Sequence, residues 1–270
     1  MQATSRDSLA ALRGELDALL DSGAEGTGLA GDVHGFANVL ETEPRLRRVL
    51  SDPAAPVERR QQTAAALLDG KVAPASLAVI SSAVGARWSS PFDLIDSLVE
   101  VGNQALFAAA EQSGGLPAVE DELFRFGRIL ESEAELATLF DDRSVELARR
   151  AGLLRSVLGD KVQPITQQLL VQALAQPGGN YALRAQRLAD DAAARQHRSF
   201  AKVRTAVALT GEQERRLAQA LTQTYGRAIE VRAEIDPAVR GGLVIRVGDE
   251  LIDGSVATRL AAARTALAGG

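Results

Sequence analysis

The feature that most constrains the fold is an internal repeat at an offset of 90 positions. Residues 36–74 and 126–164 share residue types at equivalent places, including the pairs Phe36/Phe126, Leu40/Leu130, Glu41/Glu131, Asp52/Asp142, Leu68/Leu158 and Pro74/Pro164. A repeat of this kind encodes one structural unit more than once, and each copy has to bury the same apolar positions. The sequence therefore predicts two successive units of the same architecture.

Proline and hydroxyl residues divide each copy into short helices. In the first copy, Pro56, Pro74 and Ser90-Pro91 suit helix starts, because proline is tolerated in the first turn and a serine hydroxyl can cap it. Pro164 and Gly178-Gly179-Asn180 have the same roles in the second copy. Apolar residues make up 46% of the chain but aromatic residues only 4%, a composition that favours closely packed helices. Two helical bundles are predicted.

From about Ser199 the apolar period changes from helical to alternating. Val203, Thr205 and Val207 alternate with charged or small residues. The segment from Ile229 to Ile235 alternates apolar with charged residues, the pattern of a strand with one buried face. A further strand is predicted at residues 243–247, with Gly248-Asp249 as the hairpin turn that leads to residues 251–252. A helix is expected at about 212–225, and a last helix capped by Ser255 should carry Leu260 and Leu267.

The predicted fold is mainly α, with a duplicated N-terminal helical bundle followed by a small α+β C-terminal domain. The predicted domains are residues 1–112 for the first repeat, 113–198 for the second repeat and 199–270 for the α+β domain.

Composition excludes several kinds of chemistry. The chain has no cysteine, and its two histidines, His34 and His197, lie far apart outside any paired metal-binding spacing. The net charge of −5 argues against a surface built to bind nucleic acid or anionic lipid. The longest uncharged stretch, Val72 to Ala86, is too short and too polar to cross a bilayer. We expect no metal, no cofactor and no membrane insertion.

Three motifs have two interpretations each. Gly241-Gly242 and Gly248 could form a phosphate loop, but turns between strands fit their spacing better. Asp249 and Asp253 could act as paired carboxylates, but they flank the predicted hairpin. The basic stretch from Arg184 to Arg204 could contact an acidic partner, although Asp190 and Asp191 interrupt it and a solvated helix face explains it as well.

The C-terminal segment resembles the signature of the delta subunit of bacterial ATP synthase, a family whose mitochondrial counterpart confers oligomycin sensitivity. The resemblance is carried by Ile235-Asp236-Pro237, by the run from Gly241 to Asp249, and by Ile252-Asp253-Gly254-Ser255. The signature residues that we single out are Asp236, Pro237, Gly241, Gly242, Val247, Gly248, Asp249, Asp253, Gly254 and Ser255. They are expected to shape the C-terminal domain or to dock the b subunit.

The resemblance implies a non-catalytic peripheral-stalk subunit. In this family a helical bundle holds the N-terminal segments of the alpha subunits, and the C-terminal domain meets the C-terminal helices of the b subunits. The chain is longer than the commoner members by about one helical unit and so is similar to the elongated actinobacterial form, which the repeat explains. Localisation at the cytoplasmic face of the bacterial cell membrane, as a peripheral part of the ATP synthase, is implied.

A partner helix could lie in an apolar groove between bundle helices, anchored at helical spacing. The candidate groove residues are Leu9, Leu12, Leu16, Phe36, Val39 and Leu40. The alternative is that these side chains simply form the core of the bundle. It stays open which of the two repeats would bind the alpha segment.

Two other functions compete with the stator subunit. The first is a helical adaptor or nucleic-acid-binding module that uses the basic stretch around Arg195 to Lys202. The second is an enzyme of an unrecognised kind, although no arrangement of nucleophile, base or metal ligands is evident in the sequence.

Overall fold

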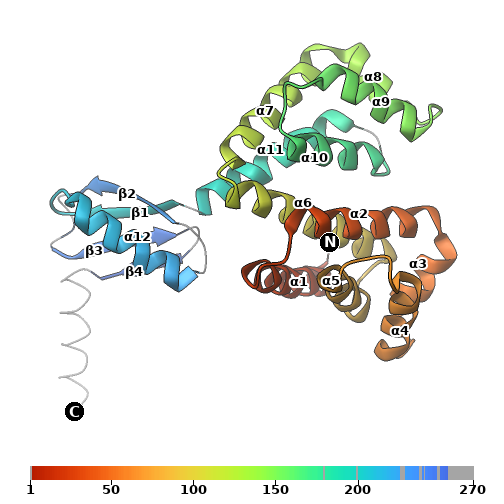
Figure 1. Ribbon diagram of the computed structural model, residues 1–270, viewed down its shortest axis with the longest axis horizontal. Helices are drawn as coiled ribbons and strands as arrows, with labels where there is room; N and C mark the ends of the chain where they lie inside the picture. Colours follow the sequence, from red (N-terminus) through yellow and green to blue (C-terminus); the bar gives the residue numbers. More distant parts are fainter. Residues whose placement is uncertain are drawn as a thin grey trace. The chain divides into compact units, whose positions relative to one another are not determined.

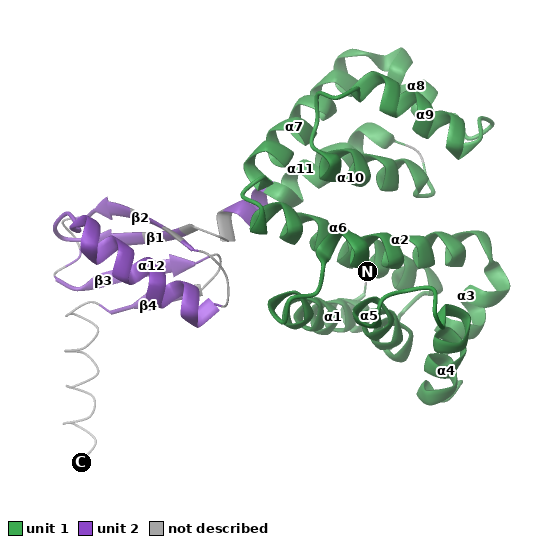
Figure 2. Cartoon of the chain, viewed as in Figure 1, with its two compact units in different colours: residues 1–192 green, residues 193–270 purple. Residues whose placement is uncertain are grey.

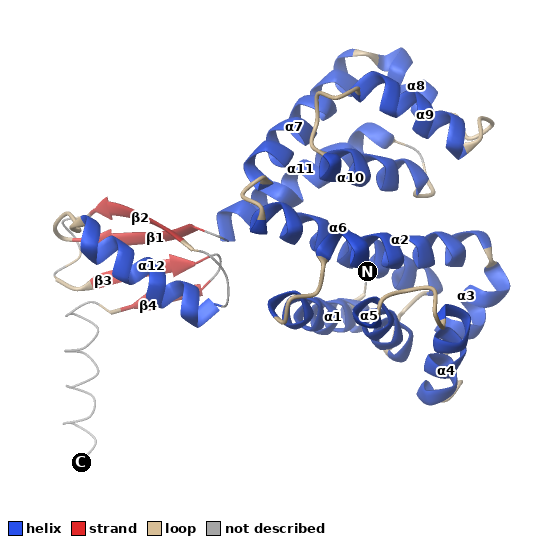
Figure 3. Cartoon of the chain, in the orientation of Figure 1, coloured by secondary structure: helices blue, strands red, loops and turns tan. Residues whose placement is uncertain are grey.

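The computed structural model of the chain describes residues 2–178, 180–198, 200–225, 229–236, 239, 241–247 and 250–254. It divides into two compact units, residues 1–192 and 193–270 (Figure 2). The first unit is helical, and the second contains the end of one helix, a four-stranded sheet and a further helix (Figure 3). The predicted fold class, mainly α with a small α+β domain at the C-terminal end, is confirmed.

Eleven of the helices in the described part of the chain begin within the first unit (Figure 1). They are α1 (Ala3–Asp21), α2 (Gly26–Thr42), α3 (Pro44–Ser51), α4 (Val57–Leu68), α5 (Pro74–Gly85), α6 (Pro91–Gln112), α7 (Leu116–Ser132), α8 (Ala134–Asp141), α9 (Leu147–Leu158), α10 (Pro164–Ala175) and α11 (Tyr181–Arg198).

The helix boundaries reproduce the repeat seen in the sequence. Helices α2 to α5 and α7 to α10 contain 17, 8, 12 and 12 residues in both copies, and each pair begins 90 positions apart. The same offset places α1 onto residues 93–111, which lie inside α6. Helix α6 therefore ends the first repeat and also occupies the place of α1 in the second.

Local sequence explains where the helices begin. Pro44, Pro74, Pro91 and Pro164 all lie in the first turn of a helix, where the missing N–H has no helical partner to lose. The Ser90 hydroxyl caps α6 by accepting a hydrogen bond from the backbone N–H of residue 92, as the sequence predicts.

The buried apolar side chains of the first unit form one continuous core that runs from Leu9 to Ala192. Helix α2 packs along α6, and α10 contacts both of them. The Asn38 and Gln172 amides pair across α2 and α10, with N···O distances of 3.3 and 3.4 Å. The two repeats share this core, so position 112/113 does not separate two compact bodies. The predicted boundary there stays a prediction about where the first repeat ends.

The second unit is built on a mixed sheet with the strand order β2-β1-β3-β4. Its elements are β1 (Phe200–Thr205), α12 (Gly211–Tyr225), β2 (Glu230–Ile235), β3 (Leu243–Val247) and β4 (Glu250–Asp253). β1 and β2 are parallel and α12 connects them, as parallel strands require a crossover. β3 and β4 are antiparallel, with Val247 opposite Glu250. The predicted hairpin turn, Gly248-Asp249, lies outside the described residues.

Helix α12 lies across one face of this sheet (Figure 1). Ala201, Val203, Ile245 and Val247 pack on that side in a core with Leu221 of α12. Two expectations for this region are wrong, namely that Val207 belongs to the first strand and that Ile235 lies on the buried face of the second.

Val207 lies beyond the end of β1, and Ile235 ends the edge strand β2 with 60% of its surface exposed. An edge strand has a neighbour on one side only, so a side chain at its end is poorly covered. The predicted last helix, with its cap at Ser255 and with Leu260 and Leu267, lies outside the described residues.

Candidate docking surfaces

The described residues of the C-terminal signature hold turns and strand ends. Asp236 follows β2, where its N–H donates to the Thr205 carbonyl (2.9 Å) and its carboxylate pairs with the Arg204 guanidinium (3.1 Å). Gly241 and Gly242 have φ values of 80° and 83°, in the left-handed region that favours glycine. These backbone angles support the interpretation of Gly241-Gly242 as a turn between strands and not as a phosphate loop.

The later signature residues close the β3–β4 hairpin. Val247 is buried in the core of the second unit, and Asp253 ends β4 opposite Val244. The Gly254 N–H donates to the Leu243 carbonyl at 2.9 Å. Four other members of the signature lie outside the described residues, namely Pro237, Gly248, Asp249 and Ser255.

The sheet face opposite α12 carries a shallow hollow of about 320 Å³. Arg204 and Glu234 are paired in the β1–β2 register at this face, and Val244, Arg246 and Leu251 complete the lining. Leu251 is about half exposed, so the hollow combines charged and apolar side chains. Such a mixture is common at the rim of a protein interface.

Five of the six candidate groove residues are buried by the protein's own helices. Leu9, Leu12 and Leu16 of α1 and Phe36 and Leu40 of α2 belong to the core, as the core interpretation expects. The sixth, Val39, is 44% exposed. Assignment of these six residues to a partner groove stays a prediction, and Val39 is the member of the set that a partner could contact without movement of the bundle.

Exposed apolar side chains recur at equivalent positions of the two repeats. Four positions of the first repeat have an exposed apolar counterpart 90 residues later, in the pairs Val39/Ile129, Val49/Leu139, Val57/Leu147 and Leu67/Val157. Single exposed apolar residues are ordinary on protein surfaces. Their recurrence at the same helix positions indicates that both repeats keep the same apolar surface, although α3 has three arginines and α8 has none.

A cleft of about 500 Å³ lies between α6 and the α10–α11 segment. We call it the α6–α11 cleft. Its lining includes Asp96, Val99 and Asn103 of α6 and Leu183, Arg187 and Leu188 of α11. Acidic and basic side chains thus face a partly apolar space within the helical unit.

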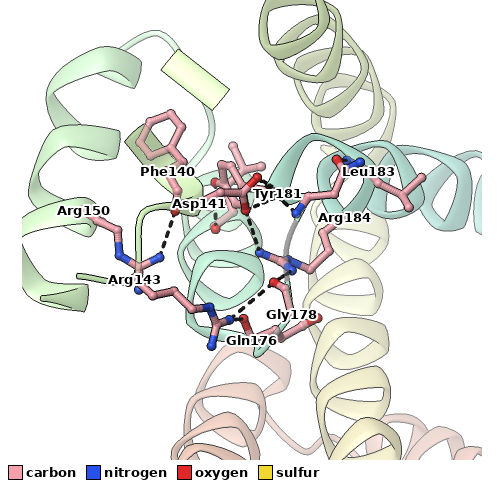
Figure 4. Close-up of polar contacts among 11 residues, drawn as sticks. Phe140, Asp141, Arg143, Arg150, Gln176, Gly178, Tyr181, Leu183 and Arg184 are labelled. Carbon is pink, nitrogen blue, oxygen red and sulfur yellow. Dashed lines mark hydrogen bonds and ion pairs between the residues drawn. The ribbon is translucent and has the colours of Figure 1, made fainter. Parts of the chain in front are cut away.

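A polar network fixes the start of α11 beside this cleft (Figure 4). The Asp141 carboxylate, at the end of α8, accepts hydrogen bonds from the N–H groups of Asn180 (3.1 Å) and Tyr181 (3.0 Å). Asn180 caps the helix by accepting from the Leu183 N–H at 2.8 Å. Arg184 lies 3.7 Å from the same carboxylate and donates to the Gly178 carbonyl at 2.6 Å. The network confirms the predicted helix start at Asn180.

Two buried arginines are related by the repeat. Arg60 donates to the carbonyls of Val84 (2.5 Å), Gly85 (3.2 Å) and Ala86 (3.1 Å), at the C-terminus of α5. Arg150 donates to the carbonyl of Phe140, at 2.9 Å, near the end of α8. A cation satisfies the unpaired carbonyls and the negative end of a helix. The sequence shows that these arginines recur 90 positions apart, but it does not show that they bind carbonyl groups at helix ends.

His34 is buried between α2 and α6. Its Nε2 lies 3.2 Å from the Val99 carbonyl, and burial lowers the pKa of the imidazole to about 4. A Cβ atom added at Gly102 would lie 2.3 Å from the ring, so α6 needs glycine there for close approach. His34 is therefore a neutral packing residue of the helical core, in agreement with its interpretation as an ordinary helix residue.

The basic stretch from Arg184 to Arg204 is interrupted by acidic residues and by contacts within the chain. Arg184 is held by Asp141 and Gly178, and Asp190 and Asp191 interrupt the series. Within the described ranges, no group of three or more His, Asp or Glu side chains could hold a metal ion. The helices described here include none that is long and apolar enough to cross a membrane.

Comparison with known proteins identifies relatives along the whole chain. The family model described as ATP synthase delta (OSCP) subunit matches residues 103–267. ATP synthase subunit delta of Streptomyces griseus is 43% identical, covering 100% of both chains. The proteins of the same name from a Parafrankia species and from Corynebacterium aurimucosum are 42% and 40% identical, over 99% of this chain and 99% and 100% of theirs.

Proposed function

The chain belongs to the ATP synthase delta (OSCP) subunit family, the peripheral-stalk component of F-type ATP synthase, and we propose that it joins the alpha subunits to the b subunits. It is a non-catalytic structural subunit. In the proposed arrangement the helical unit binds the N-terminal segments of the alpha subunits. The C-terminal unit binds the C-terminal helices of the b subunits.

The division of the chain into two units carries this proposal. Residues 1–192 and the sheet unit each have a hydrophobic core of their own. Two separately packed bodies in one polypeptide can hold two partners, because each body keeps its surface when the other is bound.

The recurring exposed apolar positions support docking of partner segments on the helical unit. They lie on α2, α3 and α4 and again on α7, α8 and α9. An amphipathic helix of a partner binds through such positions by burying its own apolar face.

A stator subunit must stay bound while the rotor turns. Rotation inside the motor loads every contact of the stalk, so slow dissociation matters more than rapid association. Interfaces of this durability bury on the order of 2,000 Å² or more in total. In the proposed arrangement, the chain is held peripherally at the cytoplasmic face of the bacterial cell membrane through the other subunits of the synthase.

Removal of the chain from purified synthase tests the proposal. We expect ATP hydrolysis by the catalytic head to persist while its coupling to proton transport is lost, and we expect readdition of the chain to restore coupling. Loss of hydrolysis itself would contradict a purely structural role, and retained coupling would contradict the link between alpha and b.

The assignment of the b subunit to the C-terminal unit can be tested at Gly242. Gly242→Val places a β-branched side chain at a φ of 83°, which costs about 1–3 kcal/mol. We expect weaker binding of b and unchanged binding of alpha, measured by pull-down with each isolated subunit. Gly211→Val is the matched control, since a Cβ there meets nothing within 4 Å and the backbone angle is ordinary. Unchanged affinity of the Gly242 variant for b would overturn the assignment.

A further inference from the structure

Helix α10 lies between two cavities of the helical unit. One is the α6–α11 cleft, which Ala173 of α10 helps to line. The other, of about 240 Å³, lies between α2 and α10, and we call it the α2–α10 cavity. Its lining includes Ala30, Gly31 and His34 of α2 and Gln168 and Val171 of α10. Protein interiors contain few voids larger than a water molecule, so a helix with a cavity on each side has unusual freedom to shift.

Between these cavities, α10 contacts α2 through the amide pair of Asn38 and Gln172. Its N···O distances of 3.3 and 3.4 Å are longer than the usual value of about 2.9 Å. Gln172 also lines the α2–α10 cavity. A pair of long hydrogen bonds tolerates small displacements better than interdigitated apolar side chains, which have to repack.

Helix α10 is held more firmly by its own repeat. The Gln163 N–H, at its start, donates to the Glu122 carboxylate of α7 at 2.8 Å. The buried Tyr181 hydroxyl of α11 donates to the Leu170 carbonyl of α10 at 3.0 Å. The second repeat can therefore move as one body that carries α10 with it.

Helix α2 is in turn packed closely on α6. A Cβ atom added at Gly26 would lie 2.8 Å from the Ala105 carbonyl oxygen, so the two backbones are almost in contact there. Toward α10 the same helix leaves space, because a Cβ atom added at Gly31 would meet nothing within 4 Å. The free space thus lies between the repeats and not within the pair of α2 and α6.

The first repeat contains the helix pair equivalent to α6 and α11 in a closed arrangement. The offset of 90 positions places α1 onto α6 and α6 onto α11. Helices α1 and α6 are in direct contact, and Arg13 pairs with Glu100 at 2.9 Å. The equivalent residues of the second repeat are Asn103 and Asp190, which cannot form an ion pair. The second repeat therefore lacks the ion pair that fixes this helix pair in the first.

We propose that the second repeat rocks against the first about α6, with α10 moving between the two cavities. Movement of α10 toward α2 closes the α2–α10 cavity and widens the α6–α11 cleft, and the return movement does the reverse. Shifts of packed helices by about 1–2 Å are common in conformational changes, and here they need no helix to unfold. This inference goes beyond the proposed function and does not depend on which partner the helical unit binds.

Spin labels test the motion, because the chain has no native cysteine. The pair Leu67→Cys and Val157→Cys places one label on each repeat at equivalent positions, both 40% exposed. The pairs Val39→Cys with Leu67→Cys and Ile129→Cys with Val157→Cys place both labels on one repeat. In the isolated full chain, the distance distribution from pulsed electron paramagnetic resonance should be at least about twice as wide for the pair between repeats as for either pair within a repeat.

The pairs within a repeat are matched controls. Each shares a label position with the pair between repeats, so local motion of α4 or α9 would widen the control distribution as well. Equal widths for all three pairs would overturn the proposal.

Filling the α2–α10 cavity tests where the motion is taken up. Gly31→Leu places an apolar side chain in this space and should narrow the distribution between repeats to the width of the controls. Gly35→Leu, also in α2 and with nothing within 4 Å of its Cβ, lies outside the lining and should leave the distribution unchanged. Both replace a helical glycine, so the gain in helix propensity is the same.

A distribution that stays wide in a folded Gly31→Leu variant would overturn the assignment of the motion to this cavity. The comparison of label pairs without any cavity substitution decides the existence of the motion even if Gly31→Leu fails to fold.

Discussion

At the scale of single residues, Gly102 of α6 lies against the His34 ring of α2. A methyl group at Gly102 would meet the ring 2.3 Å away, on a buried side chain with little freedom to move. We expect Gly102→Ala to lower the free energy of unfolding by about 1–3 kcal/mol, the usual cost of overpacking. Gly14→Ala, in α1 with nothing within 4 Å, should instead raise it by roughly 0.5–1 kcal/mol. Urea unfolding of the two variants checks the pair, and equal effects would contradict the packing argument.

The buried His34 imidazole should also make stability depend on pH. Its pKa is lowered from 6.5 to about 4, so the folded state holds the neutral form while the unfolded state binds a proton over that interval. The stabilisation is therefore complete above pH 6.5 and is lost as the pH falls towards 4, with about 3.5 kcal/mol as an upper limit at roughly 1.4 kcal/mol per pKa unit.

His34→Gln removes the titrating group but keeps a donor for the Val99 carbonyl. Urea unfolding of both proteins at several pH values between 4 and 7.5 should therefore show a shallower slope for the variant. If the two slopes are the same, His34 does not carry this pH dependence.

At the scale of helices, the buried arginines hold helix ends. Arg60 satisfies three carbonyls at the C-terminus of α5, so its loss leaves buried acceptors unpaired. We expect Arg60→Met to lower the free energy of unfolding by about 2–4 kcal/mol, and Arg59→Met, at the neighbouring exposed position, by less than about 0.5 kcal/mol. Chemical denaturation measures both, and a small effect at Arg60 would mean that water replaces the guanidinium.

The sequence predicted the helices better than the contacts between them. Prolines such as Pro74 and Pro164 mark helix starts locally, and the 90-residue offset repeats them, so both signals can be read without tertiary structure. The use of α6 by both repeats depends on packing between distant segments. The same holds for the network around Asp141 and Arg184, whose members are 43 positions apart in the sequence.

The candidate groove illustrates the same limit. An apolar stripe such as Leu9, Leu12 and Leu16 has the same spacing whether it binds a partner or its own bundle, and burial in the folded chain distinguishes the two. The α6–α11 cleft could not be predicted, because Asp96 and Arg187 become opposing walls only when α6 and α11 are placed beside each other.

At the scale of the whole molecule, the separate cores of the two units predict that the helical unit folds without the sheet unit. A fragment of residues 1–198 keeps α11 complete and retains the whole core from Leu9 to Ala192. We expect it to unfold cooperatively, to bind the alpha N-terminal peptide with the affinity of the full chain and to lose binding to b, as measured by calorimetry. The full-length Gly242→Val variant should show the same pattern of partner binding, because it damages the sheet unit alone. If the fragment fails to fold or loses the alpha peptide, the helical unit depends on the sheet unit, and the proposed division of partners between the two would be wrong.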